Sequence, residues 1–504
     1  MEDIIIEQKE DAENTLFKKK DMNILICSIL LGVLFDILFY NKPLGISYPL
    51  FVIAFYVAFL WNLRPIMSFR ISFGWLLTIP IVALSSTYFI FTNQIFAVLN
   101  FLIIPFLIIA QTILISEENK YNWYDSRFMM DIFSGVFNRA FSCTSKPFII
   151  GLSSLRIRKR HKKYDVLQKV LIGLGFSIPL LMIIISLLSS ADRVFSHFIA
   201  EITSSFETIN IAIFSLQAMI ALVITIIAFS YIWSFTNSNS NLKNQQHEVR
   251  ETNPSGWDPI ISITILSVIN CVYVVFAIIQ FAYLFASVNN ALPPDFTYAE
   301  YARRGFFELL MITLINFGLL LSSISFTQKD SKLVARTVQL LHSLLIICTV
   351  VILLSAYFRM SLYEAAYGYT YLRVLTHFFM IFLGVLFLIA FYKIWNEHMS
   401  LLKPYIVITI VAYMIINFSN IDVLIANKNI NRYLETGKLD TYYLRNLSYD
   451  SIPELVNLLD VQKPSREIRE YLVEQQKKLS KKQSWQSFNL SQHKAKEVLA
   501  QYKL

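Results

Sequence analysis

The chain has 504 residues and a net charge of +9 at pH 7; 55% of its side chains are hydrophobic and only 16% are charged. A soluble protein of this length does not bury so much apolar material, so the composition excludes a wholly soluble protein. We expect a polytopic membrane protein. Its positive charge indicates membrane orientation and contact with membrane lipids rather than nucleic-acid binding.

Eleven apolar runs are candidates for membrane-spanning helices, since about 20 apolar residues cross the hydrocarbon core. They lie at residues 24–40, 46–63, 71–91, 95–115, 166–188, 209–232, 260–286, 306–326, 338–358, 371–394 and 405–418, and the last is the shortest. The predicted fold class is therefore all-α: a polytopic transmembrane helix bundle of about 11 spans with a small C-terminal helical domain.

The apolar runs divide the chain into five parts. Residues 1–23 form a cytoplasmic tail, 24–115 the first four spans, 116–165 a basic cytoplasmic loop with an interfacial helix over 124–141, 166–418 spans five to eleven, and 419–504 the C-terminal domain. Within that domain, helices are predicted over 420–435 and 465–482, the second charged and amphipathic.

Loop charges predict the orientation of the bundle. Residues 156–163, RIRKRHKK, place six fixed positive charges in a short loop, which the positive-inside rule assigns to the cytoplasm. Lysines of the N-terminal tail and of the loops near residues 243, 329 and 393 fall on the same side, whereas the outer loops are neutral or acidic. An odd number of spans then places the N-terminus inside and the C-terminus outside.

Cysteine and histidine patterns do not support a metal or cofactor site. The four cysteines have no paired spacing, and the seven histidines are scattered over both sides of the predicted topology. The sequence also lacks a glycine-rich phosphate loop and the G-x-S-x-G and H-E-x-x-H motifs. We therefore expect no cofactor and no metal, and no ATP-driven transport within this chain.

The stretch 297–315, TYAEYARRGFFELLMITLI, carries charged residues directly into a hydrophobic helix. Thr297 and Glu300 have the spacing of a capping box, which predicts a helix start at Thr297. From there Glu300, Arg304 and Glu308 follow one another at four-residue spacing on one helical face. Charges at the mouth of a membrane helix are costly unless they are paired or face water, so this stretch is a candidate site.

Two further capping boxes are predicted. Ser361 with Glu364 precedes the tenth span, so the seventh and eighth spans resemble the ninth and tenth, as in transporters built from repeats. Ser451 with Glu454 predicts a helix start in the C-terminal domain, with proline tolerated in its first turn.

With this topology, ionisable and tyrosine side chains collect near the outer mouth of the membrane. Asp36 lies about 18 Å along the first span, short of the outer surface, where a carboxylate requires a partner such as an arginine from the eighth or tenth span. The candidate polar pocket comprises Asp36, Tyr298, Glu300, Tyr301, Arg303, Arg304, Glu308, Arg359, Tyr363, Glu364, Arg373 and Asp422.

This composition suits an anionic or polyhydroxylated headgroup. The same residues also have structural explanations: the glutamates as helix caps, the tyrosines as an interfacial belt and the arginines as partners along a helix or as phosphate contacts.

Three motifs carry a family resemblance: YAEYARRGFFEL, RMSLYEAAYGYTYLR and IDVLIANKNINRYLETGKLDTYYLRNLSYDSIPEL. Together they resemble the bacterial membrane proteins grouped as domain of unknown function 4173, related to the 4153 group. The resemblance implies a multi-pass protein of the bacterial cytoplasmic membrane but no activity and no catalytic residue. The family's motif residues match Tyr298, Glu300, Tyr301, Arg303, Arg304, Gly305 and Glu308.

The leading functional hypothesis is a non-enzymatic transporter or envelope-handling protein with an outward-facing polar pocket for a lipid or glycan headgroup. One alternative is a membrane-embedded transferase acting on a lipid-linked substrate, with Asp36, Glu300 or Glu308 as base. Another is a sensor or scaffold whose outer domain binds a partner. The sequence does not indicate an oligomeric state.

Overall fold

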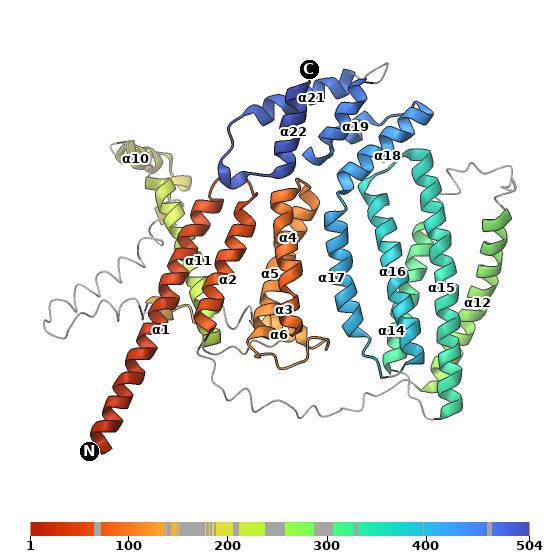
Figure 1. The fold of residues 1–504 in the computed structure, drawn as a ribbon, viewed down its shortest axis with the longest axis horizontal. Coiled ribbons are helices and arrows are strands. Elements are labelled where there is room, and N and C mark those ends of the chain that lie inside the picture. The colour runs from red at the N-terminus through yellow and green to blue at the C-terminus, as the bar shows by residue number, and fades with distance from the viewer. Residues whose placement is uncertain are drawn as a thin grey trace. The chain divides into compact units, whose positions relative to one another are not determined.

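The computed structural model describes residues 2–64, 72–135, 188–204, 211–236, 258–286, 306–326, 331–396, 398–460 and 466–502, with scattered positions between 137 and 185. Every regular element in these ranges is a helix, which confirms the all-α fold class (Figure 1). The helices form two packed units that interleave in sequence. One unit holds residues 1–89, 100–245 and 483–489, and the other holds residues 90–99, 246–482 and 490–504.

Among the described residues, eight helices are long and apolar enough to cross a membrane, and they coincide with eight of the eleven predicted spans. The second predicted span is α2 (Ser47–Leu63), which is shorter, with 17 residues. The eleventh, α17 (Leu402–Phe418), reaches spanning length only together with α18 (Ile421–Thr436), to which it is bent by 56°. The predicted span at 166–188, the basic loop at 156–163 and the cap at Thr297 lie mostly or wholly outside the described residues.

The first unit packs α1 (Glu2–Phe39) against α2 and α11 (Ile211–Thr236). Gly32 permits the close approach to α11, because a Cβ atom there would lie 2.4 Å from the carbonyl oxygen of Ala221. This unit also holds α3 (Phe73–Leu76), most of α4 (Thr78–Ile90) and of α5 (Gln94–Ile115), α6 (Phe128–Ser134), α10 (Arg193–Ser204) and the 3-10 helix η6 (Trp485–Ser487). The interfacial helix predicted over 124–141 begins later than expected, at Phe128, and most of the residues after 135 in that range lie outside the described residues.

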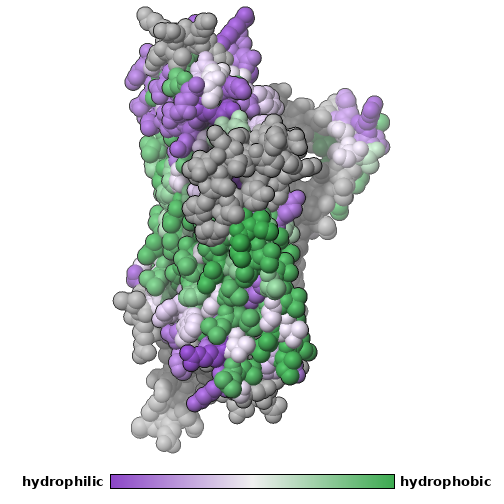
Figure 2. Space-filling view, turned by 90° about the vertical axis from the view of Figure 1, so that its right-hand side faces the viewer, coloured by the Kyte–Doolittle hydropathy of each residue, from purple (hydrophilic) through white to green (hydrophobic). Residues whose placement is uncertain are grey.

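In the second unit, α12 (Pro259–Ala286), α14 (Phe306–Phe326), α15 (Lys332–Tyr367) and α16 (Tyr371–Trp395) form a bundle with α17. α15 packs against α12, α14 and α16, and Leu320, Leu345 and Phe387 are fully buried in one shared core cluster. Hydrophobic side chains form a band across the face seen in Figure 2, between hydrophilic ends. Exposed apolar side chains of α12, such as Val268 and Val272, suit contact with lipid.

Buried polar side chains link three of these helices inside the bundle. Tyr273 of α12 donates to Asn316 Oδ1 of α14 at 2.7 Å, and Asn316 Nδ2 donates to Thr349 Oγ1 of α15 at 2.9 Å. Ser355 of α15 donates to Gln280 Oε1 of α12 at 2.7 Å. Hydrogen bonds between helices in a membrane contribute roughly 0.6 kcal/mol each on average, so they favour one register of α15 against its neighbours.

α15 is one continuous helix of 36 residues. It begins after Ser331, whose side chain accepts from the backbone N–H of Val334. The helix start predicted at Ser361 is therefore wrong. Ser361 lies inside α15, and its hydroxyl donates to the carbonyl oxygen of Tyr357 at 3.0 Å.

A layer of short helices follows α17. After α18 come α19 (Thr441–Arg445), η4 (Tyr449–Ser451), α20 (Ile452–Val456), η5 (Asn457–Asp460), α21 (Arg466–Ser480) and α22 (Leu490–Gln501). They bury one apolar core that includes Ile425, Leu455 and Leu472. α18 and α21 confirm the helices predicted over 420–435 and 465–482. The helix start predicted at Ser451 is confirmed, since Ser451 is the N-cap of α20 and proline lies in the first turn, but the side-chain bond of the capping box is not formed, because the Ser451 hydroxyl donates to the carbonyl oxygen of Ser448.

Candidate functional site

The turn between α15 and α16 brings Arg373 beside Tyr363 and His377 beside Glu364. α15 ends at Tyr367 and is capped by Gly368, which has φ 84° and ψ 175°, a conformation that essentially only glycine adopts. The Gly368 amide donates to the carbonyl oxygen of Glu364 at 2.8 Å, and α16 begins three residues later at Tyr371. The two helices are therefore antiparallel neighbours, with the end of α15 beside the start of α16.

Glu364 is buried at this end of α15, with 3% of its surface exposed. Its Oε2 lies 3.2 Å from Nδ1 of His377 in α16, and the imidazole ring lies over Tyr357 with centroids 4.3 Å apart. The other carboxylate oxygen, Oε1, is buried and contacts no hydrogen-bond donor among the described residues. Because a buried acceptor without a donor is costly, we expect this atom to accept from a water molecule or a ligand.

Arg373 lies on the first helical turn of α16, one turn before His377. Its guanidinium is 4.3 Å from the centroid of the Tyr363 ring, and it donates one N–H to the carbonyl oxygen of Gly368. The Tyr363 ring also contacts that of Tyr367, at 4.9 Å. A guanidinium has five N–H donors, so Arg373 retains donors for a phosphate or carboxylate while an aromatic ring holds it in place.

Two side chains of α18 hold the turn. Asn429 Oδ1 accepts from the backbone N–H of Tyr369 and its Nδ2 donates to the Tyr369 carbonyl oxygen, both at 2.8 Å. Arg432 donates to the carbonyl oxygens of Ala365 and Ala366 at 3.0 and 2.6 Å. These carbonyls belong to the last turn of α15, which has no intrahelical partners for them. The C-terminal helices therefore fix the backbone on which the site is built.

The phenol of Tyr369 reports the electrostatics of this turn. Burial raises the pKa of its hydroxyl, and the nearby Glu364 carboxylate raises it further. The phenol therefore stays neutral as a hydrogen-bonding group at physiological pH.

Asp422 does not join this cluster but forms a second network in the same unit. It is 1% exposed, and its Oδ2 accepts from Asn93 Nδ2 at 2.7 Å while its Oδ1 accepts from the backbone N–H of Ser448 at 3.1 Å. Asp450, also buried, accepts from the N–H and the hydroxyl of Thr92, both at 2.8 Å. Both carboxylates thus anchor the connection between α4 and α5 to the C-terminal helices.

The Asp422 carboxylate also affects the pKa of the Tyr443 phenol. Burial raises the pKa of Tyr443, the Asp422 carboxylate adds to the rise, and the hydrogen bond from the backbone of Tyr371 opposes it. The satisfied bonds around Asp422 indicate a structural joint rather than a ligand site.

The other residues of the predicted pocket fall in several places or lie outside the described residues. Glu308 is exposed on the first turn of α14, and Arg359 is half-buried on α15 one turn before Tyr363. Asp36 belongs to the other unit, where its buried Oδ1 contacts no donor among the described residues. Tyr298, Glu300, Tyr301, Arg303 and Arg304 lie outside the described residues. The proposed pairing of Asp36 with an arginine stays a prediction.

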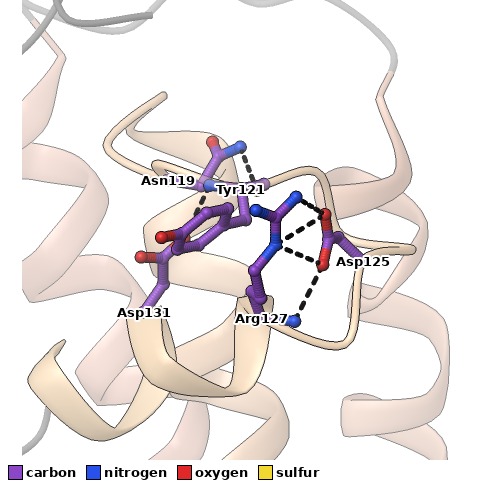
Figure 3. A network of polar contacts seen from close by, with 5 residues as sticks. All are labelled: Asn119, Tyr121, Asp125, Arg127 and Asp131. Atoms are coloured by element: carbon purple, nitrogen blue, oxygen red, sulfur yellow. Dashed lines mark hydrogen bonds and ion pairs between the residues drawn. The ribbon is translucent and has the colours of Figure 1, made fainter. Parts of the chain in front are cut away.

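The first unit holds a polar cluster of its own, in the loop before α6 (Figure 3). Asp131 Oδ2 accepts from the backbone N–H groups of Lys120 and Tyr121, both at 2.9 Å. Arg127 pairs with Asp125 at 2.7 Å and lies over the Tyr121 ring at 4.7 Å. These contacts are made within the loop and to the first turn of α6, so they explain the shape of the loop.

Sequence reasoning missed the pairing of His377 with Glu364 and the role of Asp450. The sequence signal for His377 was its place 13 residues after Glu364 across a Gly-Tyr-Thr break, where two antiparallel helices bring such positions together. No comparable signal marked Asp450, because its partner Thr92 is 358 residues away. Among the described residues, no group of three or more His, Cys, Asp or Glu side chains is arranged to hold a metal ion.

Long apolar helices, polar links between them and hydrophilic ends together define a multi-pass integral membrane protein. The family model of a domain of unknown function, DUF4153, matches residues 78–458, and the chain belongs to this family. This confirms the relation to the 4153 group, whereas membership of the 4173 family stays a prediction. Neither a curated protein nor a solved structure matches the chain significantly.

Proposed function

We propose that this protein binds a lipid or glycan headgroup at the end of α15 and α16, and that it transports or hands on this molecule at the outer face of a bacterial cytoplasmic membrane. The observation that carries the proposal is the buried Glu364–His377 pair, in which one carboxylate oxygen has no donor among the described residues, with Arg373 one helical turn before His377 on α16. A guanidinium suits a phosphate, and a carboxylate accepts from sugar or glycerol hydroxyls. The expected ligand therefore carries a phosphate next to hydroxyl groups.

The charge distribution within the second unit supports the outer location of this site. Lys332 and Arg336 lie on the first turns of α15, Lys393 on the last turn of α16 and Lys403 on the first turn of α17. Since α15, α16 and α17 follow one another as antiparallel helices, these four charges share one end of the bundle. The positive-inside rule assigns that end to the cytoplasm and the Glu364 end to the outer face.

Lipid retention tests the proposal directly. The full-length protein is reconstituted in nanodiscs of phosphatidylcholine with a minor fraction of phosphatidylglycerol. The protein is then released from the nanodiscs in the mass spectrometer, and the lipids that stay bound to it are counted by native mass spectrometry. Phosphatidylglycerol, which has a phosphate and two hydroxyls, should be enriched on the protein. Arg373→Gln and Glu364→Gln should each reduce the enrichment several-fold, whereas the exposed control Arg466→Gln should not.

Two results would contradict the proposal. Equal retention by Arg373→Gln, Glu364→Gln and wild type would show that the pair does not contact a headgroup. An equal loss of phosphatidylglycerol enrichment in the control Arg466→Gln would show that lipid retention depends on the overall charge of the protein and not on this site. Near-UV circular dichroism of each variant confirms that the fold is intact.

A transferase is the second candidate function, and one observation favours it. Glu364, His377 and Ser361 follow each other in the order of a carboxylate–imidazole–hydroxyl triad, with His377 Nε2 3.5 Å from Ser361 Oγ. The Ser361 hydroxyl instead donates to the Tyr357 carbonyl oxygen at 3.0 Å, so it must rotate before it can lose a proton to the imidazole. Headgroup binding needs no such rearrangement, so we prefer it to the transferase as the proposed function.

A fluorophosphonate probe separates the two candidates. An activated serine forms a covalent adduct with the probe, and the adduct is located by peptide mass spectrometry. Labelling of Ser361 that is lost in His377→Gln would favour the transferase. Absence of labelling, with normal labelling of a serine hydrolase added to the same sample, would leave headgroup binding as the function of this site.

A further inference from the structure

Lysines gather on the last two long helices of the C-terminal layer. Lys477 and Lys478 lie in the last turn of α21, Lys481 and Lys482 follow it, and Lys494 and Lys496 lie on α22. All six side chains are exposed. We refer to these six residues as the lysine patch.

Acidic side chains offset only a small part of this charge. Lys478 is paired with Glu474 at 2.8 Å, and Glu497 of α22 pairs with His493 at 3.2 Å. The other five lysines of the patch form no ion pair within the described residues. Clustered like charges repel one another and destabilise the folded state, so their presence calls for a ligand of opposite charge or another compensating role.

Two lysines of the patch line a hollow of about 390 Å³ between α21 and α22. Lys477 and Lys496 line it from opposite helices, together with the hydroxyl-bearing Ser480, and Leu479 and Leu499 contribute apolar surface. No acidic residue is among its lining side chains. The Ser480 hydroxyl already donates to the carbonyl oxygen of Lys477 at 2.8 Å, so the donors that the hollow offers to a ligand are the two ammonium groups, which suit a phosphate group.

Membrane topology does not explain these lysines. α18 contacts the α15–α16 turn, so the C-terminal layer lies at the end of the bundle opposite Lys332, Lys393 and Lys403. Positive charges that orient a membrane protein belong at that other end. In Figure 1, α21 lies on the side of α18 and α19 that faces away from α16 and α17. The helix α21, which carries Lys477 and Lys478, therefore lies beyond α18 and α19 as seen from the ends of α16 and α17.

We propose that the lysine patch binds a soluble polyanion with repeated phosphate groups, one phosphate occupying the hollow between α21 and α22. The positive charge of the patch and the lining of the hollow favour a phosphate group as the ligand. The position of α21 on the far side of α18 and α19 favours a soluble molecule over a lipid surface. This second site involves none of the residues of the headgroup site and does not depend on its function.

Inorganic polyphosphate is the probe for this proposal. The full-length protein in nanodiscs of phosphatidylcholine, which carry no net charge, is titrated with end-labelled polyphosphate while fluorescence anisotropy is recorded. The double variant Lys477→Gln/Lys496→Gln should weaken binding at least tenfold and flatten the dependence of affinity on salt, because fewer counterions are released. The arginine pair Lys477→Arg/Lys496→Arg should retain binding.

The matched control is Lys428→Gln/Lys438→Gln, which removes two exposed lysines of the same layer outside the patch. This pair should change the affinity less than twofold. Absence of polyphosphate binding at physiological ionic strength would overturn the proposal, as would equal losses in the control pair. Tight binding to phosphatidylglycerol vesicles without binding to polyphosphate would overturn it in favour of a membrane contact.

Discussion

Replacing Asn429 by alanine tests whether α18 fixes the backbone of the headgroup site. The variant loses both hydrogen bonds to Tyr369 and leaves its backbone N–H and carbonyl without these partners. Each such bond contributes about 0.5–1.5 kcal/mol net, and Asn429 is only half-buried, so we expect a local loss of about 1–2 kcal/mol. At a tenfold change per 1.4 kcal/mol, opening of the turn becomes roughly 5–30 times more frequent.

Hydrogen exchange measured by mass spectrometry detects this change. The peptide that covers residues 365–372 should exchange faster by that factor in Asn429→Ala, whereas peptides from α12 and α14 should not change. Asn431→Ala is the matched control, since Asn431 is exposed on the same helix and makes no such bonds. Unchanged exchange of the 365–372 peptide would refute the reasoning that α18 holds the turn.

Three further outcomes are expected. Asn316→Leu removes the two hydrogen bonds that Asn316 makes, with Tyr273 of α12 and with Thr349 of α15. The unfolding free energy in mixed micelles should therefore fall by about 1–2 kcal/mol. Gly368→Ala should lower the unfolding free energy by about 2–3 kcal/mol, since its φ is 84° and a Cβ atom would lie 2.7 Å from Asn429 Oδ1. Gly437→Ala is the control: Gly437 also has a positive φ but has open space around it, so the unfolding free energy should fall by only about 1 kcal/mol. The hydrogen bonds from Arg127 lower the pKa of Asp125 below its usual 3.8, so the ion pair stabilises its loop above that pH and is lost as the pH falls further. The acceleration of amide exchange in that loop by Arg127→Gln should therefore be present at pH 6 and vanish toward pH 2.

Span positions were predictable because hydrophobic length alone determines them. The apolar runs at 95–115 and 371–394 match α5 and α16 within a residue, since few charged side chains interrupt them. Helix starts were not predictable in the same way. Ser361 and Glu364 have the capping-box spacing, yet the apolar surface on both sides of Ser361 keeps α15 helical through it. A capping pattern is therefore informative only where the chain is free to change direction.

Pairing between distant residues accounts for what sequence reasoning missed. Glu364 was selected as a cap, and the structure makes it the partner of His377, because the short turn at Gly368 brings α16 back along α15. Asp422 was grouped with Glu364 by its predicted depth. Its actual partners, Asn93 and Ser448, come from distant parts of the chain, and periodicity within one helix contains no information about them.

The contacts of α18 also determine which experiments can separate the functions of the two sites. Arg432 and Asn429 supply partners for backbone groups at the end of α15 that would otherwise remain unpaired beside the membrane. Deleting residues 420–504 would therefore disturb the headgroup site together with the lysine patch, and a loss of function would assign neither. Surface variants such as Lys477→Gln leave α18 in place, whereas Arg373→Gln alters the site without touching α21. Only such single-site changes attribute a phenotype to the headgroup or to the polyanion.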